Sequence, residues 1–455
     1  MTALAVLARE MGIEVTGSDV DKEFQTDSTL RKYKIPIKIG FKKENIVGRP
    51  DLIIVTGAHG GMTNPEAVAA RKMGLSVLMH GQALGLFMED KEGISVAGCH
   101  GKTTTTALIA TILSKAHLDP SFLVGSADVP TLGGSAHFGK GKYFVAEADE
   151  YMTDPQSDRT PRFLWQNPKI AVFTSIDFDH PDAFADLSEV KLAFLEFAQK
   201  LPIAGFLIAN IDDRNVAEIL SKLKCNIITY GFSPRANFQI TYVHFGDRIT
   251  FFRAKYKNQD LGEFVLKIPG RHNAINAAAA SVVGNFLGVS WPKIKVGLSE
   301  FSGAKRRFEF VGNMNGVSLY DDYAHHPAEI GATLKAARAW FPKKRIIAIF
   351  QPHTYSRTKA LFFEFAKCFS GADEVIIIPI FSSAREEPDP AISSEILVKE
   401  IKKYHKNAHF IDKMDQVADY LKGHIIAGDV ILTMGAGDIY KLHPILKIAS
   451  QGLSF

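Results

Sequence analysis

The chain has 455 residues, of which 46% are apolar and 22% are charged, and its formal net charge is +4. This length and composition predict a globular protein of about two to four domains that needs no disulfide framework. The longest apolar stretches have the length of core strands, and the N-terminus has no basic segment followed by a cleavage site. We therefore predict neither a membrane span nor a signal peptide.

Three cysteines and a few basic runs bear on location and partners. Cys99, Cys225 and Cys368 are widely spaced and form no CxxC pair, which predicts a reducing, cytoplasmic environment. The basic runs at residues 343–345 and 402–403 are typical of solvated faces, so we expect no nucleic-acid partner. A positive local field could lower the pKa of Cys99, although a small packing role is commoner for such a residue.

Residues 1–90 alternate between helical and extended patterns. Residues 4–11 have helical spacing, residues 13–19 read as a strand that ends in an acid, and residues 51–57 read as a buried parallel strand. This alternation predicts a small doubly wound α/β unit.

A second unit begins near residue 91, and its most informative motif is GCHGKTTTT at residues 98–106. An apolar run precedes the motif and a helical pattern follows it, so backbone N–H groups and the helix dipole converge on one spot that suits phosphates. Lys102 would contact the terminal phosphates, and a hydroxyl among residues 103–106 would bind Mg²⁺. Val96 stands where the usual phosphate loop has its first glycine, so this loop is a shortened variant. A glycine turn capped by threonines is the alternative, and we favour phosphate binding.

Two acidic clusters follow predicted strands of the same unit. Glu147, Asp149 and Glu150 come after the strand at residues 142–146, and the sequence Asp-Phe-Asp-His ends at His180 after the strand at residues 170–174. Ligands gather at the carboxyl ends of strands in open α/β sheets, so these groups are predicted to hold Mg²⁺. Helix capping by the acids is the alternative.

The rest of this unit contains a further strand, a β-rich segment and an alanine-rich helix. The strand covers residues 205–210, the β-rich segment residues 227–268 and the helix residues 274–287. Asn273 and Asn276 are three residues apart at the start of the helical pattern, and their amides could recognise an adenine edge. An asparagine at a helix start is more often a cap, so both interpretations stay open.

A third α/β region starts after residue 300, with buried strands at residues 345–350, 374–379 and 430–434. The predicted fold class is therefore α/β with three domains. These are an N-terminal Rossmann-like unit (1–90), a central phosphate-loop domain (91–300) and a C-terminal Rossmann-like domain (301–455). Substrates of such a protein bind in clefts between domains.

The order and spacing of the motifs resemble those of the Mur ligases, the ADP-forming enzymes that attach amino acids to UDP-N-acetylmuramate in peptidoglycan synthesis. The resemblance covers essentially the whole chain. It rests on GCHGKTTTT (98–106), EADE (147–150), DFDH (177–180), Asn210 with Asp212 and Asp213, RHNAINAAAA (271–280), KRRFE (305–309) and DDYAHHP (321–327).

This resemblance implies ATP and Mg²⁺ as cofactors and assigns residues to both. For the ATP phosphates it implies Gly98, His100, Gly101, Lys102, Thr103 and Thr104; for Mg²⁺ it implies Thr103, Glu147 and His180. Asn276 would contact adenine with support from Asn273, and Arg307 and Asp322 would close over the nucleotide. Lys102, Mg²⁺ and the helix N-terminus would stabilise charge on the transferring phosphoryl group.

Within the family, residues 322–330, 350–358 and 428–438 resemble the alanine-adding members. Tyr323, His325, His353 and Arg357 match their alanine pocket, and the planar fork of Arg357 suits a substrate carboxylate. The resemblance implies that ATP phosphorylates the carboxylate of UDP-N-acetylmuramate to an acyl phosphate, which the amine of L-alanine attacks. Either His325 or His353 would accept the amine proton.

Three departures from the family pattern accompany this resemblance. The chain starts at Met1, where the family has a strand and a glycine loop for the UDP diphosphate, so the N-terminal domain is expected to lack both. Leu195 stands where many members have a lysine that becomes carbamylated. Thr354 stands where the alanine-adding members have a second arginine.

Two alternatives stay open. Residues 151–162 and 177–184 resemble the recycling ligase that adds a whole tripeptide to UDP-N-acetylmuramate, whereas the third domain, which reads the incoming amine, resembles the alanine enzymes. The other alternative is a non-catalytic, nucleotide-binding member of the family.

Overall fold

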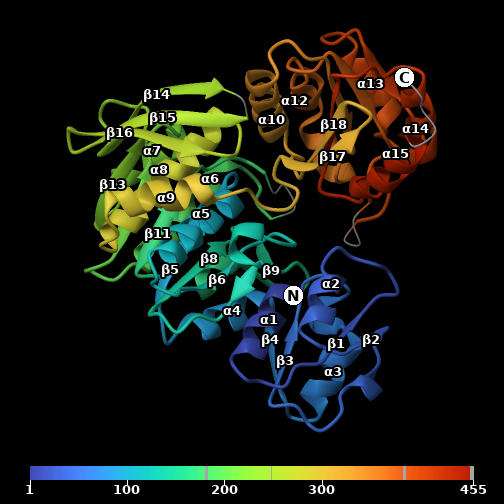
Figure 1. The fold of residues 1–455 in the computed structure, drawn as a ribbon. Helices are drawn as coiled ribbons and strands as arrows, with labels where there is room; N and C mark the ends of the chain where they lie inside the picture. The colour runs from blue at the N-terminus through green and yellow to red at the C-terminus, as the bar shows by residue number, and fades with distance from the viewer. Residues whose placement is uncertain (180–182, 247, 383–385, 451–455) are drawn as a thin grey trace. The chain divides into compact units, whose positions relative to one another are not determined.

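A computed structural model describes residues 1–179, 183–246, 248–382 and 386–450 (Figure 1). The chain packs as two compact units. The first unit comprises Met1–Tyr242, Phe252–Phe264 and Ile275–Ser302, and the second comprises Val243–Phe251, Val265–Ala274 and Gly303–Phe455. None of the described helices has the length together with the hydropathy that a membrane span requires. The predicted boundaries at residues 90 and 300 stay a prediction.

The N-terminal part of the first unit contains four α-helices and four short strands. Its elements are α1 (Thr2–Glu10), β1 (Gly17–Asp19), α2 (Asp27–Lys32), β2 (Ile37–Ile39), β3 (Leu52–Val55), α3 (Pro65–Lys72), β4 (Ser76–Met79) and α4 (His80–Met88). β1 pairs in parallel with β2, and β3 pairs in parallel with β4, in two separate sheets. The strand expected over residues 13–19 is shorter than predicted, because Ile13 is exposed and only the last three residues pair.

A large sheet forms the centre of the first unit. Its strand order is β16-β15-β14-β13-β12-β11-β5-β8-β6-β7. The strands are β5 (Glu92–Ala97), β6 (Ser121–Leu123), β7 (Ala136–His137), β8 (Tyr143–Ala148), β11 (Ile170–Phe173), β12 (Phe206–Asn210), β13 (Asn226–Gly231), β14 (Phe238–Gly246), β15 (Ile249–Tyr256) and β16 (Gln259–Leu266). β5 lies between β8 and β11 and is parallel to both, so the carboxyl ends of these three strands are neighbours.

Helices and a small hairpin complete this region. They are α5 (Lys102–Lys115), β9 (Met152–Asp154), β10 (Asp158–Pro161), α6 (Leu187–Gln199), α7 (Arg214–Leu220), α8 (Arg271–Phe286) and α9 (Trp291–Glu300). α6 begins at the cap Asp186, whose carboxylate accepts hydrogen bonds from the N–H groups of Ser188 and Glu189. Its apolar face buries Phe194 and Phe197, which pack on Phe173 of β11.

The second unit contains a six-stranded sheet in the order β17-β18-β22-β19-β20-β21, in which β17 is antiparallel to β18 and the other pairs are parallel. The strands are β17 (Glu309–Met314), β18 (Val317–Asp322), β19 (Ile346–Phe350), β20 (Glu374–Ile377), β21 (Ala408–Phe410) and β22 (Val430–Met434). The helices are α10 (Pro327–Trp340), α11 (Tyr355–Ala360), α12 (Phe362–Lys367), α13 (Ser394–Ile401), α14 (Met414–Lys422) and α15 (Leu442–Ser450).

Apolar residues fill both faces of this second sheet. Along β19, Ile346, Ala348 and Phe350 join one core cluster, whereas Ile347 and Ile349 join the cluster on the opposite face. This alternation is what a central parallel strand requires, because side chains point to opposite faces in turn. The predicted strands of this region and the α/β class are confirmed.

We expect Phe194→Ala to lower the free energy of unfolding by about 3–5 kcal/mol, because it leaves a cavity among Phe163, Phe173 and Phe197. Chemical denaturation followed by circular dichroism measures this loss. Leu192→Ala, at a 64% exposed position of the same helix, is the control and should cost less than about 0.5 kcal/mol. Equal effects of the two substitutions would contradict the packing described here.

Candidate functional site

The phosphate loop lies between β5 and α5, as the sequence predicts. Gly98 and Gly101 have φ angles of +146° and +84°, which favour glycine, and a Cβ atom on Gly101 would lie 2.6 Å from the Asn276 Oδ1 atom. Gly101 is also the N-cap of α5, and no side chain caps the helix there. The first N–H groups of α5 are therefore placed to bind an anion.

Lys102 is the first residue of α5, and its ammonium contacts the loop and an acidic cluster. The Nζ atom donates to the Gly98 carbonyl at 2.6 Å and to the Glu150 carboxylate at 2.9 Å, and it lies 4.0 Å from Asp149. Burial lowers the pKa of Lys102, but the charges of Glu150 and Asp149 outweigh burial, so the pKa is raised. Lys102 is therefore a permanent cation at the loop.

Thr103 and Glu147, two of the predicted metal ligands, lie side by side. The Thr103 hydroxyl donates to Glu147 Oε2 at 3.1 Å, and the N–H of Gly125 donates to Glu147 Oε1 at 2.5 Å. Both side chains are buried. Glu147 comes from the carboxyl end of β8, next to β5, so the strand-end prediction holds for it. The third predicted ligand, His180, lies outside the described residues. Thr104 lies half-buried in the first turn of α5.

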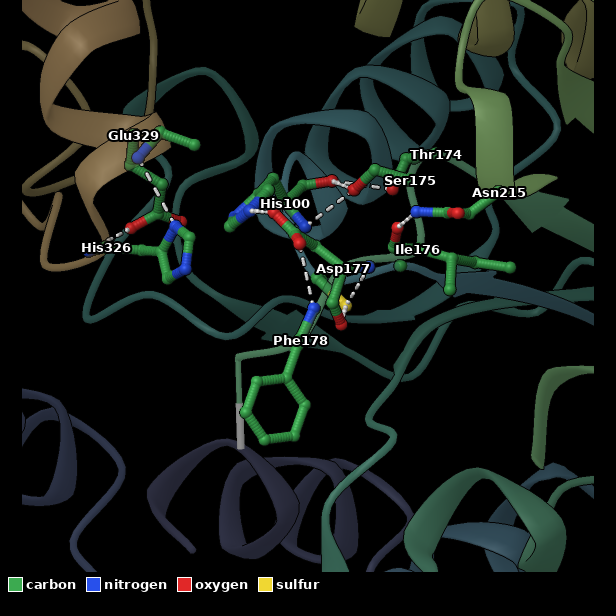
Figure 2. Close-up of polar contacts among 12 residues, drawn as sticks. His100, Thr174, Ser175, Ile176, Asp177, Phe178, Asn215, His326 and Glu329 are labelled. Carbon is green, nitrogen blue, oxygen red and sulfur yellow. Dashed lines mark hydrogen bonds and ion pairs between the residues drawn. The ribbon is translucent and has the colours of Figure 1, made fainter. Parts of the chain in front are cut away.

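The segment after β11 supports the loop from the other side (Figure 2). The backbone N–H of His100 donates to the Ser175 hydroxyl at 2.9 Å, and Thr174 Oγ1 donates to the His100 carbonyl at 2.6 Å. The His100 ring lies 3.5 Å from the Asp177 carboxylate. These contacts fix the loop backbone, so His100 has a structural role that sequence reasoning did not assign.

Cys99 is a packing residue of the loop. Its Sγ atom contacts the backbone N–H and carbonyl of Asp177, both at 3.1 Å. Burial raises the pKa of Cys99 well above its usual value, which is the opposite of the lowering that a positive field would cause. The thiol is therefore neutral.

The two asparagines of α8 differ in their surroundings. Asn273 Nδ2 donates to the Pro269 carbonyl at 2.7 Å, so its amide stabilises the start of the helix. Asn276 is buried with its Oδ1 atom against Gly101. The structure thus brings Asn276, predicted as a nucleotide ligand, to the phosphate loop.

Arg306 and Arg307 begin the site of the second unit. Arg306 is buried, and its guanidinium donates to Asp321 at 2.9 Å and to the carbonyls of Gly435 and Gly437. It thereby ties β18 to the segment after β22. The Arg307 guanidinium lies over the Tyr323 ring, 5.2 Å from its centroid. Sequence reasoning placed Arg306 in a motif but missed this anchoring role.

Asp322 is a buried carboxyl group at the carboxyl end of β18. It accepts hydrogen bonds from the N–H groups of Phe308 and Ala324, both at 2.8 Å. Burial raises the pKa of Asp322, whereas the charge of Arg307 and the hydrogen bonds oppose the rise; the resulting pKa is about 6.

The four residues predicted to bind the amino acid form a single cluster. The ring centroids of Tyr323 and His325 are 5.3 Å apart, and those of His325 and His353 are 6.1 Å apart. Arg357 is buried, and its Nη1 atom donates to the His353 carbonyl at 3.1 Å and faces His353 Nδ1 at 3.4 Å. Tyr323 and His325 follow β18, and His353 follows β19, so the cluster forms at strand ends.

Phe381 is a neighbour of this cluster that the sequence did not reveal. Its ring stacks on that of His353 with the two centroids 5.6 Å apart, and its backbone N–H donates to the Pro352 carbonyl at 2.8 Å. Phe381 follows β20, which is the next strand of the sheet, and no local motif marks it.

Comparisons with known proteins identify the family. Residues 1–92 match the Mur ligase family catalytic domain, residues 96–284 the Mur ligase middle domain, and residues 306–437 the Mur ligase glutamate ligase domain. A UDP-N-acetylmuramate–L-alanine ligase of Desulfitobacterium hafniense is 42% identical over 97% of this chain and 96% of its own length. The chain therefore belongs to the Mur ligase family.

Solved structures agree with this assignment. The UDP-N-acetylmuramate–alanine ligase of Thermotoga maritima has a TM-score of 0.82 at 26% identity, covering 99% of this chain and 96% of that chain. A murein peptide ligase of Psychrobacter arcticus has a TM-score of 0.73 at 25% identity, covering 100% of this chain and 97% of that chain. The three-domain α/β fold class is thus confirmed.

We expect the buried carboxyl group of Asp322 to contribute a fall in stability as the pH rises from about 4 to about 7. The pKa of Asp322 is raised from 3.8 to about 6, so the folded state binds more protons than the unfolded state in this window. The contribution of the neutral carboxyl group is complete below 3.8 and is lost as the pH passes through about 6. Asp322→Asn should reduce this fall in denaturation experiments, whereas Asp419→Asn, at a 71% exposed side chain, should not. An unchanged pH dependence in Asp322→Asn would contradict the assignment.

Proposed function

We propose that this protein joins L-alanine to the carboxylate of UDP-N-acetylmuramate in peptidoglycan synthesis, with ATP converted to ADP and phosphate. The observation that carries the proposal is the 42% identity to an L-alanine ligase over 97% of the chain, because this similarity spans both the phosphate loop and the histidine–arginine cluster. We assign the UDP moiety to residues 1–90.

ATP is a substrate of this reaction, and the phosphate loop is suited to its phosphates. Gly98 and Gly101 let the backbone approach closely, the uncapped start of α5 presents N–H groups, and Lys102 supplies a cation. An oxygen of the muramyl carboxylate attacks the terminal phosphorus, and ADP leaves, which gives an acyl phosphate. The fixed cation and dipole stabilise charge in this transfer without reorganising.

The donor set next to the loop fits Mg²⁺. A threonine hydroxyl and a carboxylate are hard oxygen ligands, and Thr103 and Glu147 already point toward one another. When bound, Mg²⁺ would neutralise phosphate charge. We propose His180 as a further ligand.

Asn276, Arg307 and Asp322 would contact the nucleotide, and Asn273 would support the helix that carries Asn276.

The amine of L-alanine then attacks the acyl carbon, phosphate leaves, and a nearby base takes the amine proton. His325 Nδ1 lies 2.9 Å from the Tyr323 carbonyl oxygen and 3.4 Å from a Glu329 carboxylate oxygen, which are both acceptors. In the neutral ring Nδ1 therefore carries the proton, and Nε2 is the basic nitrogen. His353 Nδ1 instead faces an N–H donor of Arg357. We therefore propose His325 Nε2 as the proton acceptor.

Arg357 is the proposed partner of the alanine carboxylate. Its guanidinium is planar and permanently charged, and its hydrogen bond to His353 orients it beside the two histidines.

We also propose a cytoplasmic location, because the three cysteines are free and so fit a reducing compartment.

The specificity for the amine distinguishes the proposed function from tripeptide addition, the alternative that residues 151–162 and 177–184 raise through their resemblance to the recycling ligases. With UDP-N-acetylmuramate and ATP supplied, L-alanine should stimulate ADP formation at least tenfold more than a tripeptide that begins with L-alanine. A coupled assay for ADP measures both rates. The reverse preference would assign the protein to the recycling ligases, and no stimulation by either amine would support a non-catalytic member.

Lys102→Ala should abolish ligation in a folded protein. Losing a cation that stabilises the transferring phosphoryl group raises the barrier by several kcal/mol, so we expect a rate loss of about 10³-fold or more. The control is Lys115→Ala, at the other end of α5, where the lysine forms an ion pair with Glu300 at the surface. Near-normal ADP release by folded Lys102→Ala would rule out this loop as the ATP site.

A further inference from the structure

We propose that Glu386 is a positioning residue for the incoming amino acid, because its carboxylate fixes the short helix that carries Arg357. The inference rests on the proposed function of Arg357 and adds a residue to it. Among the described residues, the Glu386 carboxylate contacts the N–H groups of α11 and neither the histidines nor Arg357. Its effect is exerted through the backbone of α11.

The contact between Glu386 and α11 is a helix cap supplied from a distant part of the sequence. Glu386 Oε1 accepts a hydrogen bond from the Tyr355 N–H at 2.5 Å, and Oε2 accepts one from the Ser356 N–H at 3.3 Å. The N-cap residue itself, Thr354, makes no side-chain cap bond. Two N–H groups without a partner inside the helix are thus satisfied by a carboxylate, which also complements the positive end of the helix.

α11 depends on such external contacts because it has only six residues. A helix of one or two turns is unstable by itself, since nucleation costs more than its few hydrogen bonds return. Arg357 is the third residue of α11 and is buried, so the direction of its guanidinium follows the direction of the first turn. Without Glu386, the first turn of α11 would lose two hydrogen bonds, and the orientation of the Arg357 guanidinium would no longer be fixed.

Two described residues near Glu386 in the sequence contact the cluster or α11. Phe381 stacks on His353, and Asp389 forms an ion pair of 2.8 Å with Lys359 near the C-terminal end of α11. The hydrogen bond from Lys359 lowers the pKa of Asp389, so this pair is charged. The Asp389 contact therefore attaches the same segment to the same helix, but on the far side of Arg357 from Glu386.

This arrangement predicts an effect on substrate affinity rather than on turnover. An arginine recognises a carboxylate through two parallel hydrogen bonds, and this geometry tolerates little displacement. A misplaced guanidinium weakens the binding of the amino acid, whereas the phosphate loop and the acyl phosphate step do not involve α11. The KM for the amino acid should rise while the KM for ATP stays constant.

The test compares three variants of the full-length protein, with UDP-N-acetylmuramate saturating. Glu386→Ala should raise the KM for L-alanine about 10- to 100-fold, with kcat at saturating L-alanine within about threefold of wild type. Glu386→Gln retains an acceptor oxygen but not the charge, so its KM should lie between those of wild type and Glu386→Ala. Asp389→Ala, the matched control, should change the KM by less than about twofold. Thermal denaturation establishes that each variant is folded, and Glu386→Gln serves alone if Glu386→Ala does not fold.

Three outcomes would overturn the proposal. An unchanged KM for L-alanine in folded Glu386→Ala would show that α11 keeps its position without the cap. If Asp389→Ala raised the KM for L-alanine as much as Glu386→Ala does, the effect of Glu386 would not be specific to the start of α11. A loss of kcat with no change in KM would place Glu386 in the chemistry. If the wild-type protein used a tripeptide instead of L-alanine, the proposed function would fail, and the same comparison made with the tripeptide would still decide the role of Glu386.

Discussion

Both sites depend on one constraint, which is that charge buried at the end of a parallel strand must be neutralised by a partner from a neighbouring segment. Lys102 at the end of the β5 loop has 13% of its side chain exposed and pairs with Glu150, which follows β8. Arg306 is buried beside β18 and pairs with Asp321 at the end of that strand. An unpaired buried charge would cost several kcal/mol, so these pairs fix how the loops lie.

The two pairs prepare different kinds of chemistry. The Lys102 pair leaves a cation and the start of a helix next to a hydroxyl and a carboxylate, which is an environment for phosphate and metal. The Arg306 pair fixes the carbonyls of Gly435 and Gly437 and places a cation over Tyr323, which follows β18. Tyr323 in turn begins the cluster that ends at Arg357. Lys102 itself is assigned to the proposed phosphate chemistry, whereas the Arg306 salt bridge supports the proposed amino-acid cluster without belonging to it.

Sequence reasoning found the parts of the sites that are local in the chain. The phosphate loop is one strand, turn and helix start, and its glycines reveal their role because only they tolerate the required φ angles. Tyr323 with His325, and His353 with Arg357, form two short motifs, and the parallel order of β18, β22 and β19 brings the motifs together. Glu386 and Phe381 lie in a segment that reaches the cluster only through tertiary packing, so no pattern near them in the sequence marks them.

Errors in the prediction also have local physical reasons. Residues 13–16 have an extended sequence pattern, but only Gly17–Asp19 pairs with a neighbouring strand. A segment forms a strand when its backbone pairs with another strand, and the sequence pattern alone does not ensure this. Cys99 was considered for a lowered pKa because of the positive loop, yet desolvation by its neighbours dominates and raises the pKa. For the strand, the deciding contact comes from a residue far away in the sequence, Ile37. For the thiol, burial raises the pKa of Cys99 although the hydrogen bond with the Asp177 backbone opposes the rise.

The acidic cluster at the end of β8 gives a physical reason for a divalent cation in the proposed reaction. Asp149 and Glu150 lie against Lys102, and Glu147 contacts Thr103, so a triphosphate at the loop would approach three carboxylates. Coulomb repulsion between two like charges about 4 Å apart is about 4 kcal/mol near a protein surface. Mg²⁺ held by Thr103 and Glu147 would supply positive charge that offsets this repulsion. Lys102 would then exchange part of its contact with Glu150 for one with the terminal phosphate, so the same carboxylates that keep the lysine charged would also make nucleotide binding depend on the metal.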